Sequence, residues 1–183
     1  DDTLSLFTKK ISELLPMDTC VVYLLNETRS VAIAKQVEGL NSEALKNRKL
    51  RVGQGTTGET LQTLEPISAS GPAVELEFVN SYRSMASVPL VAHDRLLGAV
   101  SIYSREFRFY EEEHMRLLET VAKIASDAIW TALTHAETEV RALTDPMTGL
   151  PNARSLQARI ESEISRARRS GKKSKNLMID LDG

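Results

Sequence analysis

The sequence has little that could form disulfides, bind metals or enter a membrane. It holds 183 residues, of which one is cysteine (Cys20), one is tryptophan and three are histidine. A single cysteine excludes an internal disulfide, which fits a reducing compartment. No apolar run approaches the ~20 residues that span a bilayer, and no signal peptide is visible. We therefore expect a cytoplasmic location and no membrane segment in this stretch.

The histidines and the charge balance argue against two further kinds of site. His93, His114 and His135 form no ligand cluster, since the last two lie about 31 Å apart at helical rise. The formal net charge is −2, which argues against a general nucleic-acid surface. We expect no nucleic-acid partner and no metal held by histidines.

A long helix is predicted from about residue 110 to residue 144. Three glutamates at 111–113 crowd its start, where the helix dipole favours negative charge. Asp145-Pro146 ends it, because the residue before a proline avoids the α region. Apolar residues recur in steps of four and three, which is the spacing of a heptad seam: Leu118, Ala122, Ala125, Ile129, Ala132 and Ala136. The seam predicts a parallel homodimer, and the alternative is a terminal helix lying on its own domain.

Two further features of this helix bear on signalling. A second stripe, Leu117, Val121, Ile124 and Ala128, flanks the seam and is expected to pack on the preceding domain. After Ala136 the next apolar step is again four, to Val140, which is a stutter that locally unwinds a supercoil. The alanine-rich seam would hold one register loosely, so the helix is a hypothesised switch as well as a spacer.

The residues before the long helix predict an α+β domain. An amphipathic helix runs from Leu4 to Leu15 and is stopped by Pro16. Strands are predicted at 20–25, 31–37, 84–91 and 96–103, with a short extended piece at 50–52, a loop at 68–72 and an ambiguous segment at 73–79. Gly98 inside the last strand indicates a close backbone approach or a bulge. The order predicts an antiparallel sheet with helices on one side.

Three glycines match a dinucleotide-binding fingerprint by letter. They are Gly53, Gly55 and Gly58, but no βαβ unit surrounds them and the helix that follows is too short. We interpret them as glycines that permit a tight turn.

Three pieces of the first 133 residues, in order, resemble GAF domains. Residues 52–59 (Val-Gly-Gln-Gly-Thr-Thr-Gly-Glu) look like the mid-domain turn and helix. Residues 85–90 and 97–102 look like the last hairpin, and Phe109 with the acidic run and Leu117-Leu118 looks like the closing helix. The resemblance implies a GAF sensory domain at 1–133, with a small-molecule pocket between the sheet and residues 39–82. The ligand cannot be identified, and a filled pocket without ligand is the alternative.

The segment Asp145 to Asn152 resembles the opening of GGDEF domains, the diguanylate cyclase catalytic domain. It keeps the aspartate, Thr148, Gly149, Leu150 and Asn152, and Arg154 follows, while Met147 and Ala153 replace a leucine and an arginine. Residues 177–182 look like the first strand of that domain. We therefore predict a coupling helix at 134–144 and the truncated start of a GGDEF domain at 145–183. Both ends of the sequence, Asp1 and Gly183, are expected to be boundaries within a longer chain.

The resemblance also implies a metal site. In GGDEF domains the first aspartate of the Asp-x-Asp pair binds metal together with the next backbone carbonyl, which here are Asp180 and the carbonyl of Leu181. Carboxylates at strand ends commonly hold Mg²⁺ with substrate phosphates. The alternative is a solvated strand end.

These features together predict the sensory region of a bacterial-type diguanylate cyclase, whose intact form would join two GTP molecules into cyclic di-GMP. Each domain of a dimer would hold one GTP with Mg²⁺, and the segment from Asp1 to Gly183 would be inactive alone. Two alternatives stay open. One is a GAF ligand-binding module with a degenerate GGDEF domain, and the other is a hybrid with a phosphodiesterase domain.

Overall fold

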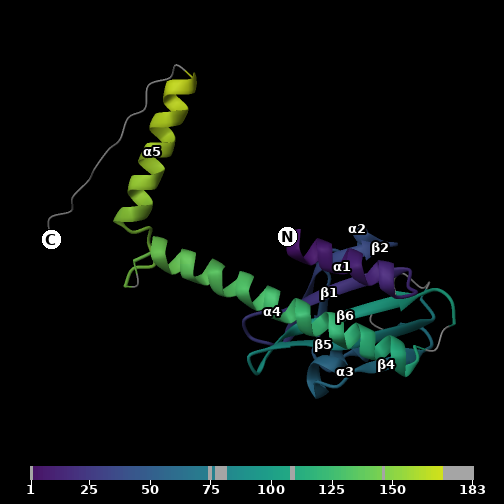
Figure 1. Cartoon of the computed structure of the whole chain (residues 1–183). Helices are drawn as coiled ribbons and strands as arrows, with labels where there is room; N and C mark the ends of the chain where they lie inside the picture. The colour runs from purple at the N-terminus through teal and green to yellow at the C-terminus, as the bar shows by residue number, and fades with distance from the viewer. Residues whose placement is uncertain (1, 74–75, 77–81, 108–109, 146, 171–183) are drawn as a thin grey trace. The chain divides into compact units, whose positions relative to one another are not determined.

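The structure is a computed structural model that describes residues 2–73, 76, 82–107, 110–145 and 147–170. The chain forms two compact units, Asp1–Ala132 and Leu133–Gly183. Figure 1 shows the elements of both units along the chain. Each unit is considered by itself below.

The first unit is built on an antiparallel sheet. Within the described residues the sheet has six strands in the order β3-β2-β1-β6-β5-β4. Its strands are β1 (Thr19–Leu25), β2 (Val31–Gly39), β3 (Lys49–Arg51), β4 (Ile67–Ser70), β5 (Ser84–Ala92) and β6 (Arg95–Ser104). The helices of this unit are α1 (Asp2–Leu14), α2 (Ser42–Leu45), α3 (Gly55–Thr63) and α4 (Glu112–Leu143), of which the last runs on into the second unit.

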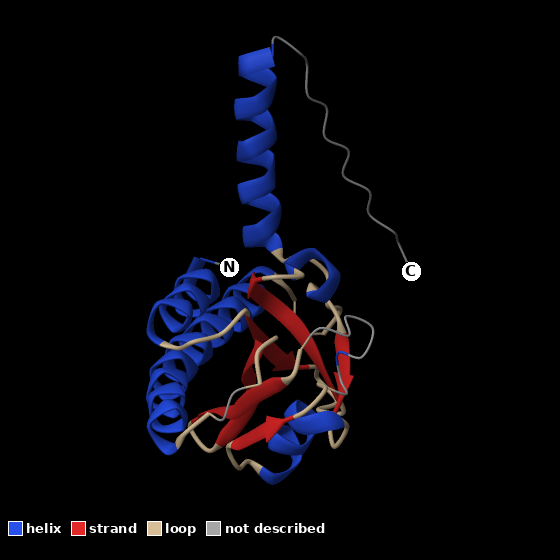
Figure 2. Ribbon diagram, turned by 90° about the vertical axis from the view of Figure 1, so that its right-hand side faces the viewer, coloured by secondary structure: helices blue, strands red, loops and turns tan. Residues whose placement is uncertain are grey.

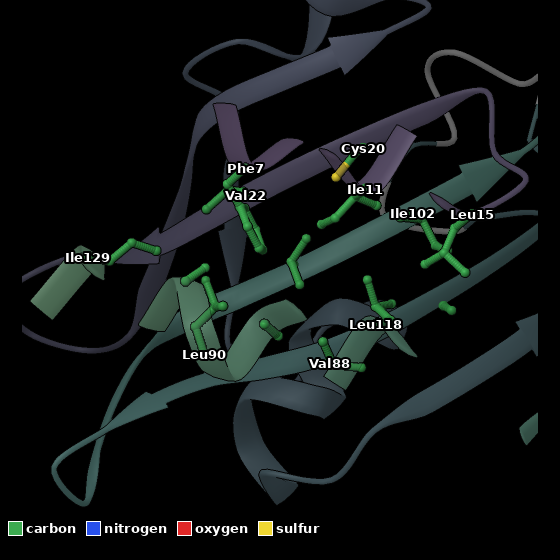
Figure 3. Packing of buried hydrophobic residues seen from close by; sticks show 14 of the residues in the cluster. Phe7, Ile11, Leu15, Cys20, Val22, Val88, Leu90, Ile102, Leu118 and Ile129 are labelled. Carbon is green, nitrogen blue, oxygen red and sulfur yellow. The ribbon is translucent and has the colours of Figure 1, made fainter. Parts of the chain in front are cut away.

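Each face of the sheet carries its own core, because successive side chains of a strand point to opposite faces. On one face Val22, Val88 and Ile102 pack with side chains of α1 and α4 (Figure 3). On the other face Tyr23 and Tyr103 pack with Leu45 of α2 and Leu61 of α3. The two long helices thus share one face, and the two short helices cover the other (Figure 2).

The predicted α+β fold with an antiparallel sheet is confirmed, and the predicted strands lie within two residues of their predicted ends. The helices do not lie on one side as predicted, because α2 and α3 pack on the face opposite α1 and α4. The loop predicted at 68–72 is wrong for residues 68–70, which belong to β4. That strand pairs Ile67 to Ser70 with Ser87 to Ser84 of β5. It is short, half-buried and mostly serine and alanine, so it lacks the apolar alternation that marks a strand. Most of the ambiguous segment at 73–79 lies outside the described residues.

Gly98 lies at a close approach of two strands, as predicted. A Cβ atom there would clash with the backbone carbonyl of Tyr23 on β1. The β5–β6 turn just before it consists of His93 and Asp94, with φ angles of 49° and 58°. Both central residues are therefore left-handed, as a two-residue turn that matches strand twist requires. After the turn, β6 runs antiparallel beside β1, and the paired residues include Tyr23↔Ala99 and Leu24↔Gly98.

The predicted roles of the two stripes on α4 are reversed in part in the first unit. The residues of the expected partner seam, from Leu118 to Ile129, are buried in the core on the sheet, with Ile129 only 4% exposed. In the second stripe, which the sequence predicts to pack on the domain, Leu117 and Val121 are half-buried against the core as predicted, whereas Ile124 is 68% exposed and Ala128 is exposed. The two stripes have the same spacing, so periodicity could not tell which one meets the sheet. Side chains at 136–143 are not described, so the stutter stays a prediction.

The second unit contains α5 (Ala153–Ser170), which follows the turn after α4. Its apolar residues Leu156, Ile160 and Ile164 recur at helical spacing, as predicted. Leu156 is exposed, and Ile164 is exposed as well. Among the described residues no helix is both long and apolar enough to cross a membrane.

The orientation of α4 can be tested by one pair of substitutions. We expect Ile129→Ala to lower the free energy of unfolding by roughly 2–5 kcal/mol, because it removes a buried side chain and leaves a cavity. Ile124→Ala should change it by less than about 0.5 kcal/mol, since that side chain is mostly exposed. Urea denaturation at a single protein concentration measures both. Equal losses for the two variants would contradict the orientation.

Candidate functional site

The sheet face under α3 carries a buried network of hydroxyl groups. The hydroxyls of Tyr23 and Tyr103 lie 3.2 Å apart, and Tyr103 lies 3.2 Å from Thr57 Oγ1. Thr57 Oγ1 also bonds Ser101 Oγ at 2.8 Å, and Ser101 in turn donates to Ser87 Oγ at 2.9 Å. All five side chains are buried. Three strands, β1, β5 and β6, and the first turn of α3 are thereby joined by polar contacts.

A second group of polar contacts ties Tyr82 to the opposite end of β1. Its hydroxyl lies 2.6 Å from Thr19 Oγ1 and accepts a hydrogen bond from Asn41 Nδ2 at 3.1 Å. The ring of Tyr82 is tilted against that of Tyr103, with centroids 5.3 Å apart. Tyr82 lies at the end of the crossover between β4 and β5. These contacts therefore fix the end of the crossover against the sheet.

The chemistry of this face is neutral. Among the described residues, the buried polar side chains are all serine, threonine or tyrosine, and none carries a charge at neutral pH. Thr60 of α3 is buried, and its Oγ1 has no hydrogen-bond partner within the described part of the chain. A buried hydroxyl without a partner costs roughly 1–3 kcal/mol. The arrangement can offer neutral donors and acceptors to a small polar molecule.

Sequence reasoning missed this hydroxyl network. The signal for it is present, since Ser87, Ser101 and Tyr103 alternate with apolar residues on strands that are otherwise buried. The pocket predicted between the sheet and residues 39–82 would lie on this face. Tyr23, Tyr103 and Leu45 are fully buried there, and residues 74, 75 and 77–81 are not described. The pocket therefore remains a proposal.

Cys20 lies on the other face and is fully buried among the side chains of α1 and α4 (Figure 3). Burial raises the pKa of its thiol far above the ordinary value, and Glu38 adds to the rise. A thiol held neutral and covered is neither a nucleophile nor a metal ligand. The interpretation of Cys20 as a small core residue is confirmed. Among the described residues there is no group of three or more histidine, cysteine or acidic side chains that could hold a metal ion.

The β5–β6 turn contacts α4 near the end of the first unit. The ring of His93 lies 5.3 Å from that of Trp130, and the Arg95 guanidinium lies 5.6 Å from the centre of the same indole. A cation over an indole at this distance is attracted by the ring quadrupole. Trp130 is half-buried and follows Ile129 directly. The turn thus holds α4 at the last residues that pack on the sheet.

In the second unit, the segment after α4 is a closed turn organised by Asp145. Its Oδ1 accepts hydrogen bonds from the backbone N–H of Met147 at 3.1 Å, and from the N–H and hydroxyl of Thr148, each at 2.9 Å. The Asp145 N–H donates to the Leu150 carbonyl at 2.8 Å, and Thr144 pairs with Pro151 as an isolated bridge. Gly149 has a φ of 69°, which a side chain would disfavour. These bonds explain why an aspartate, a threonine and a glycine occur at this spacing.

Asn152 connects this turn to α5. Its Oδ1 accepts from the N–H of Ser155 at 3.0 Å, which is the N-cap interaction of a helix that begins at Ala153. Its Nδ2 lies 3.5 Å from the Thr144 carbonyl, toward which it donates. The asparagine therefore joins the residue after α4 to the first turn of α5. All three polar residues of the motif make structural hydrogen bonds in the described part of the chain.

The sequence-predicted metal residues, Asp180 and Leu181, lie outside the described residues. Arg154 lies on α5, and its side chain is not described.

Comparison with known families assigns both units. The family model "GAF domain" matches residues 1–129, and "Diguanylate cyclase, GGDEF domain" matches residues 142–183. The first match covers more than half of the sequence, and the chain belongs to the GAF domain family. A partial GGDEF domain follows the GAF domain.

One curated relative extends this assignment. The diguanylate cyclase DgcP of Pseudomonas aeruginosa is 33% identical over 91 residues, a match that covers 48% of this chain. The match spans only 14% of the length of that relative.

Solved structures show the same fold as the first unit. A GAF domain from an Acinetobacter phosphoenolpyruvate-protein phosphotransferase is 21% identical, with a TM-score of 0.65 over 74% of this chain and 85% of its own. Its counterpart from Coxiella burnetii is 24% identical, with a TM-score of 0.66 over 73% of this chain and 84% of its own. The GAF-B domain of DevS from Mycobacterium smegmatis is 14% identical, with a TM-score of 0.65 over 75% and 97%. At these identities the likeness shows the fold alone.

The turn at Asp145 makes a prediction about pH. Hydrogen bonds from Thr148, first from its backbone N–H and then from its hydroxyl, hold the pKa of the Asp145 carboxyl below its ordinary value of 3.8. Because the pKa is lowered in the folded state, the carboxylate stabilises the turn at pH values above the ordinary pKa. This stabilisation is lost as the pH falls through the lowered, folded-state pKa. We expect Thr148→Val to move the pKa of Asp145 upward, since the hydroxyl bond is lost.

Titration of the Asp145 carboxyl carbon by NMR measures this change. Thr131→Val is the matched control, because its hydroxyl bonds a backbone carbonyl within α4 and not Asp145. An unchanged pKa in Thr148→Val would contradict the assignment of the hydroxyl bond.

Proposed function

We propose that this chain is the sensory and coupling region of a diguanylate cyclase that joins two GTP molecules into cyclic di-GMP. The observation that carries the proposal is the GGDEF match at 142–183, which begins within the helix that closes the GAF domain. The closed turn from Thr144 to Asn152 supports it, because the residues shared with the GGDEF opening are those that make its hydrogen bonds. The identity to DgcP supports the same activity.

In this proposal the metal is Mg²⁺, held by Asp180 and the backbone carbonyl of Leu181. A carboxylate and a carbonyl oxygen suit a hard cation that also binds substrate phosphates. The metal would neutralise charge on the GTP phosphates as each of the two phosphodiester bonds forms and pyrophosphate leaves the α-phosphate. Joining two GTP molecules needs two facing sites, so the working form would be a homodimer with both GGDEF domains leaving α4 in the same direction. A cytoplasmic location, where GTP is available, belongs to the same proposal.

The proposal is tested with the protein extended through a complete GGDEF domain. Incubation with GTP and Mg²⁺, followed by chromatography, should yield cyclic di-GMP, and Asp180→Asn should abolish the product while leaving the thermal melting curve unchanged. The amide keeps the size of the carboxylate but removes the charge that binds the metal.

The matched control is Glu161→Gln, which makes the same carboxylate-to-amide change at an exposed position of α5. It should leave turnover unchanged. Near wild-type turnover in Asp180→Asn would contradict the metal site. No product from the unmodified protein would instead favour a degenerate GGDEF domain acting as a receptor.

We further propose that the sensor takes a small neutral or weakly polar molecule at the hydroxyl face under α3. The buried hydroxyls of Thr57, Thr60 and Ser101 supply donors and acceptors but no counter-charge for an ion. Ala73, Leu76 and Tyr82, from the connection between β4 and β5, pack on this face. Loops positioned on a rigid sheet commonly carry binding residues.

The variant Thr60→Val separates this role from a purely structural one. It removes a buried hydroxyl that has no partner within the described residues, so the free energy of unfolding should rise by about 1 kcal/mol. A thermal-shift screen of small metabolites identifies ligands, and their stabilising shift should shrink in the variant. A ligand that protects only backbone amides outside residues 39–82 in hydrogen exchange would contradict this site.

A further inference from the structure

A hollow of about 350 Å³ lies in the first unit where α4, β5 and the segment that joins α3 to β4 meet. Figure 1 labels these elements. The hollow is lined by residues of all three, which include Leu64, Pro66, Pro89, Val91, Glu119 and Lys123. Its volume falls within the range of small-molecule sites, about 300–1,000 Å³. It is separate from the hydroxyl network, because no residue of that network lines it.

The hollow lies beside an open stretch of sheet edge. Strand β4 pairs only with Ser84 to Ser87 of β5, so the outer edge of β5 from Val88 to Ala92 meets no strand among the described residues. Pro89 lies in this open stretch and has no N–H to donate, and a proline at a sheet edge disfavours the addition of a further strand. An extended peptide that pairs with β5 is therefore a poor occupant, and a small molecule is a better one.

One side of the hollow is apolar. Leu64 is 49% exposed, and Pro66, Pro89 and Val91 are half-buried. Leu64 ends α3 in a left-handed conformation with a φ of 61°. Glycine commonly occupies this position at the end of a helix, so a leucine there adds apolar surface beside the hollow at a conformational cost.

The α4 side of the hollow presents one acid and one base. Glu119 and Lys123 are one helical turn apart, about 6 Å along the axis, and this order of the two residues is the one that favours an ion pair on a helix. Glu112 and Arg116, at the same spacing on α4, do form such a pair at 2.6 Å. Glu119 and Lys123 make no side-chain hydrogen bond or ion pair within the part of the chain that the structure describes. Their carboxylate and ammonium groups are therefore free to meet a ligand.

The lining defines the chemistry of a matching ligand. An apolar molecule would leave both charged groups without a partner, and a molecule with a single charge would leave one of them. An α-amino acid carries an ammonium and a carboxylate on the same carbon, so both can contact α4 at once. An apolar side chain on that carbon can then cover the apolar side of the hollow.

We propose that this hollow binds a free α-amino acid with an apolar side chain. The ligand's ammonium pairs with Glu119 and its carboxylate with Lys123, while its side chain packs on the apolar side defined by Leu64, Pro66, Pro89 and Val91. Such a ligand bridges β5 and α4, and it stabilises the packing of the helix that leads to the partial GGDEF domain. The binding itself does not depend on the proposed cyclase activity.

Titration of the chain with L-leucine, followed by NMR of the backbone amides, tests the site. We expect saturable shifts at Leu64, Val91 and Lys123, with a Kd of about 1 mM or below. Two analogues separate the charged contacts: 4-methylpentanoate lacks the ammonium group, and 3-methylbutylamine lacks the carboxylate. Each should bind about fivefold or more weakly than leucine, because it loses one charge-assisted contact.

Substitutions on α4 assign each contact. Glu119→Gln should weaken leucine binding by about fivefold or more but leave the binding of 4-methylpentanoate unchanged, because that analogue has no ammonium to lose. Lys123→Met should weaken leucine binding similarly, and Lys123→Arg should retain it. Both positions are exposed, so the thermal melting curves should not change. The matched controls are Glu113→Gln on α4 and Lys9→Met on α1, which lie outside the lining and should leave binding unchanged.

The outcomes separate this inference from the cyclase proposal, because no step uses GTP. Loss of leucine binding in Glu119→Gln and Lys123→Met, with binding kept in the controls, supports the site whether or not the complete protein makes cyclic di-GMP. The absence of binding by leucine, methionine and phenylalanine at millimolar concentrations overturns it. Binding that persists in both variants, or that is lost in Thr60→Val instead, also overturns it and places the ligand at the hydroxyl face or elsewhere.

Discussion

The packing of α4 on the sheet is the constraint on which the first unit depends. Leu118, Ala122, Ala125 and Ile129 are buried against β5, β6 and α1, and small residues at two of these positions let the helix approach closely. The same contact decides which residues of α4 remain outside. Once the inner stripe is on the sheet, helical geometry leaves Ile124 and Ala128 toward solvent beside α1. The packing of the inner stripe of α4 on the sheet therefore forms the core and also leaves an apolar groove beside α1.

Sequence patterns predicted which segments form strands and helices better than they predicted which side of α4 packs on the sheet. Strands β1, β2, β5 and β6 are long and apolar, so their existence and approximate ends could be predicted, and Gly98 was correctly interpreted as a close approach. The short strand β4 could not, because Ile67 to Ser70 owe their conformation to pairing with β5 rather than to their own propensity. The two stripes of α4 have the same spacing, so the sequence pattern could not show which of them packs on the sheet. That choice depends on the tertiary fit between the helix and the sheet.

Of the two candidate sites, the sequence could predict one and could not predict the other. The motif from Asp145 to Asn152 could be recognised because its hydrogen bonds are local, and each needs a particular residue at a fixed spacing. The hydroxyl network could not, since Thr57 and Ser101 are far apart in sequence and meet only when α3 lies on β6. A serine in a buried strand needs a hydrogen-bond partner, but which residue provides that hydrogen bond depends on the tertiary fold.

The corrected orientation of α4 also changes how a signal can leave the sensor. A seam that slid between two registers, as the alanine-rich stripe suggested, would require Leu118 and Ile129 to leave a close-packed core, and packed interiors resist such movement. Movement at Ile124 has no such cost, because its side chain is exposed within the chain. The contact of Trp130 with His93 and Arg95 lies at the end of the inner stripe, on the turn that joins two strands of the hydroxyl face. A ligand that altered the pairing of β5 with β6 would therefore reach α4 through this turn.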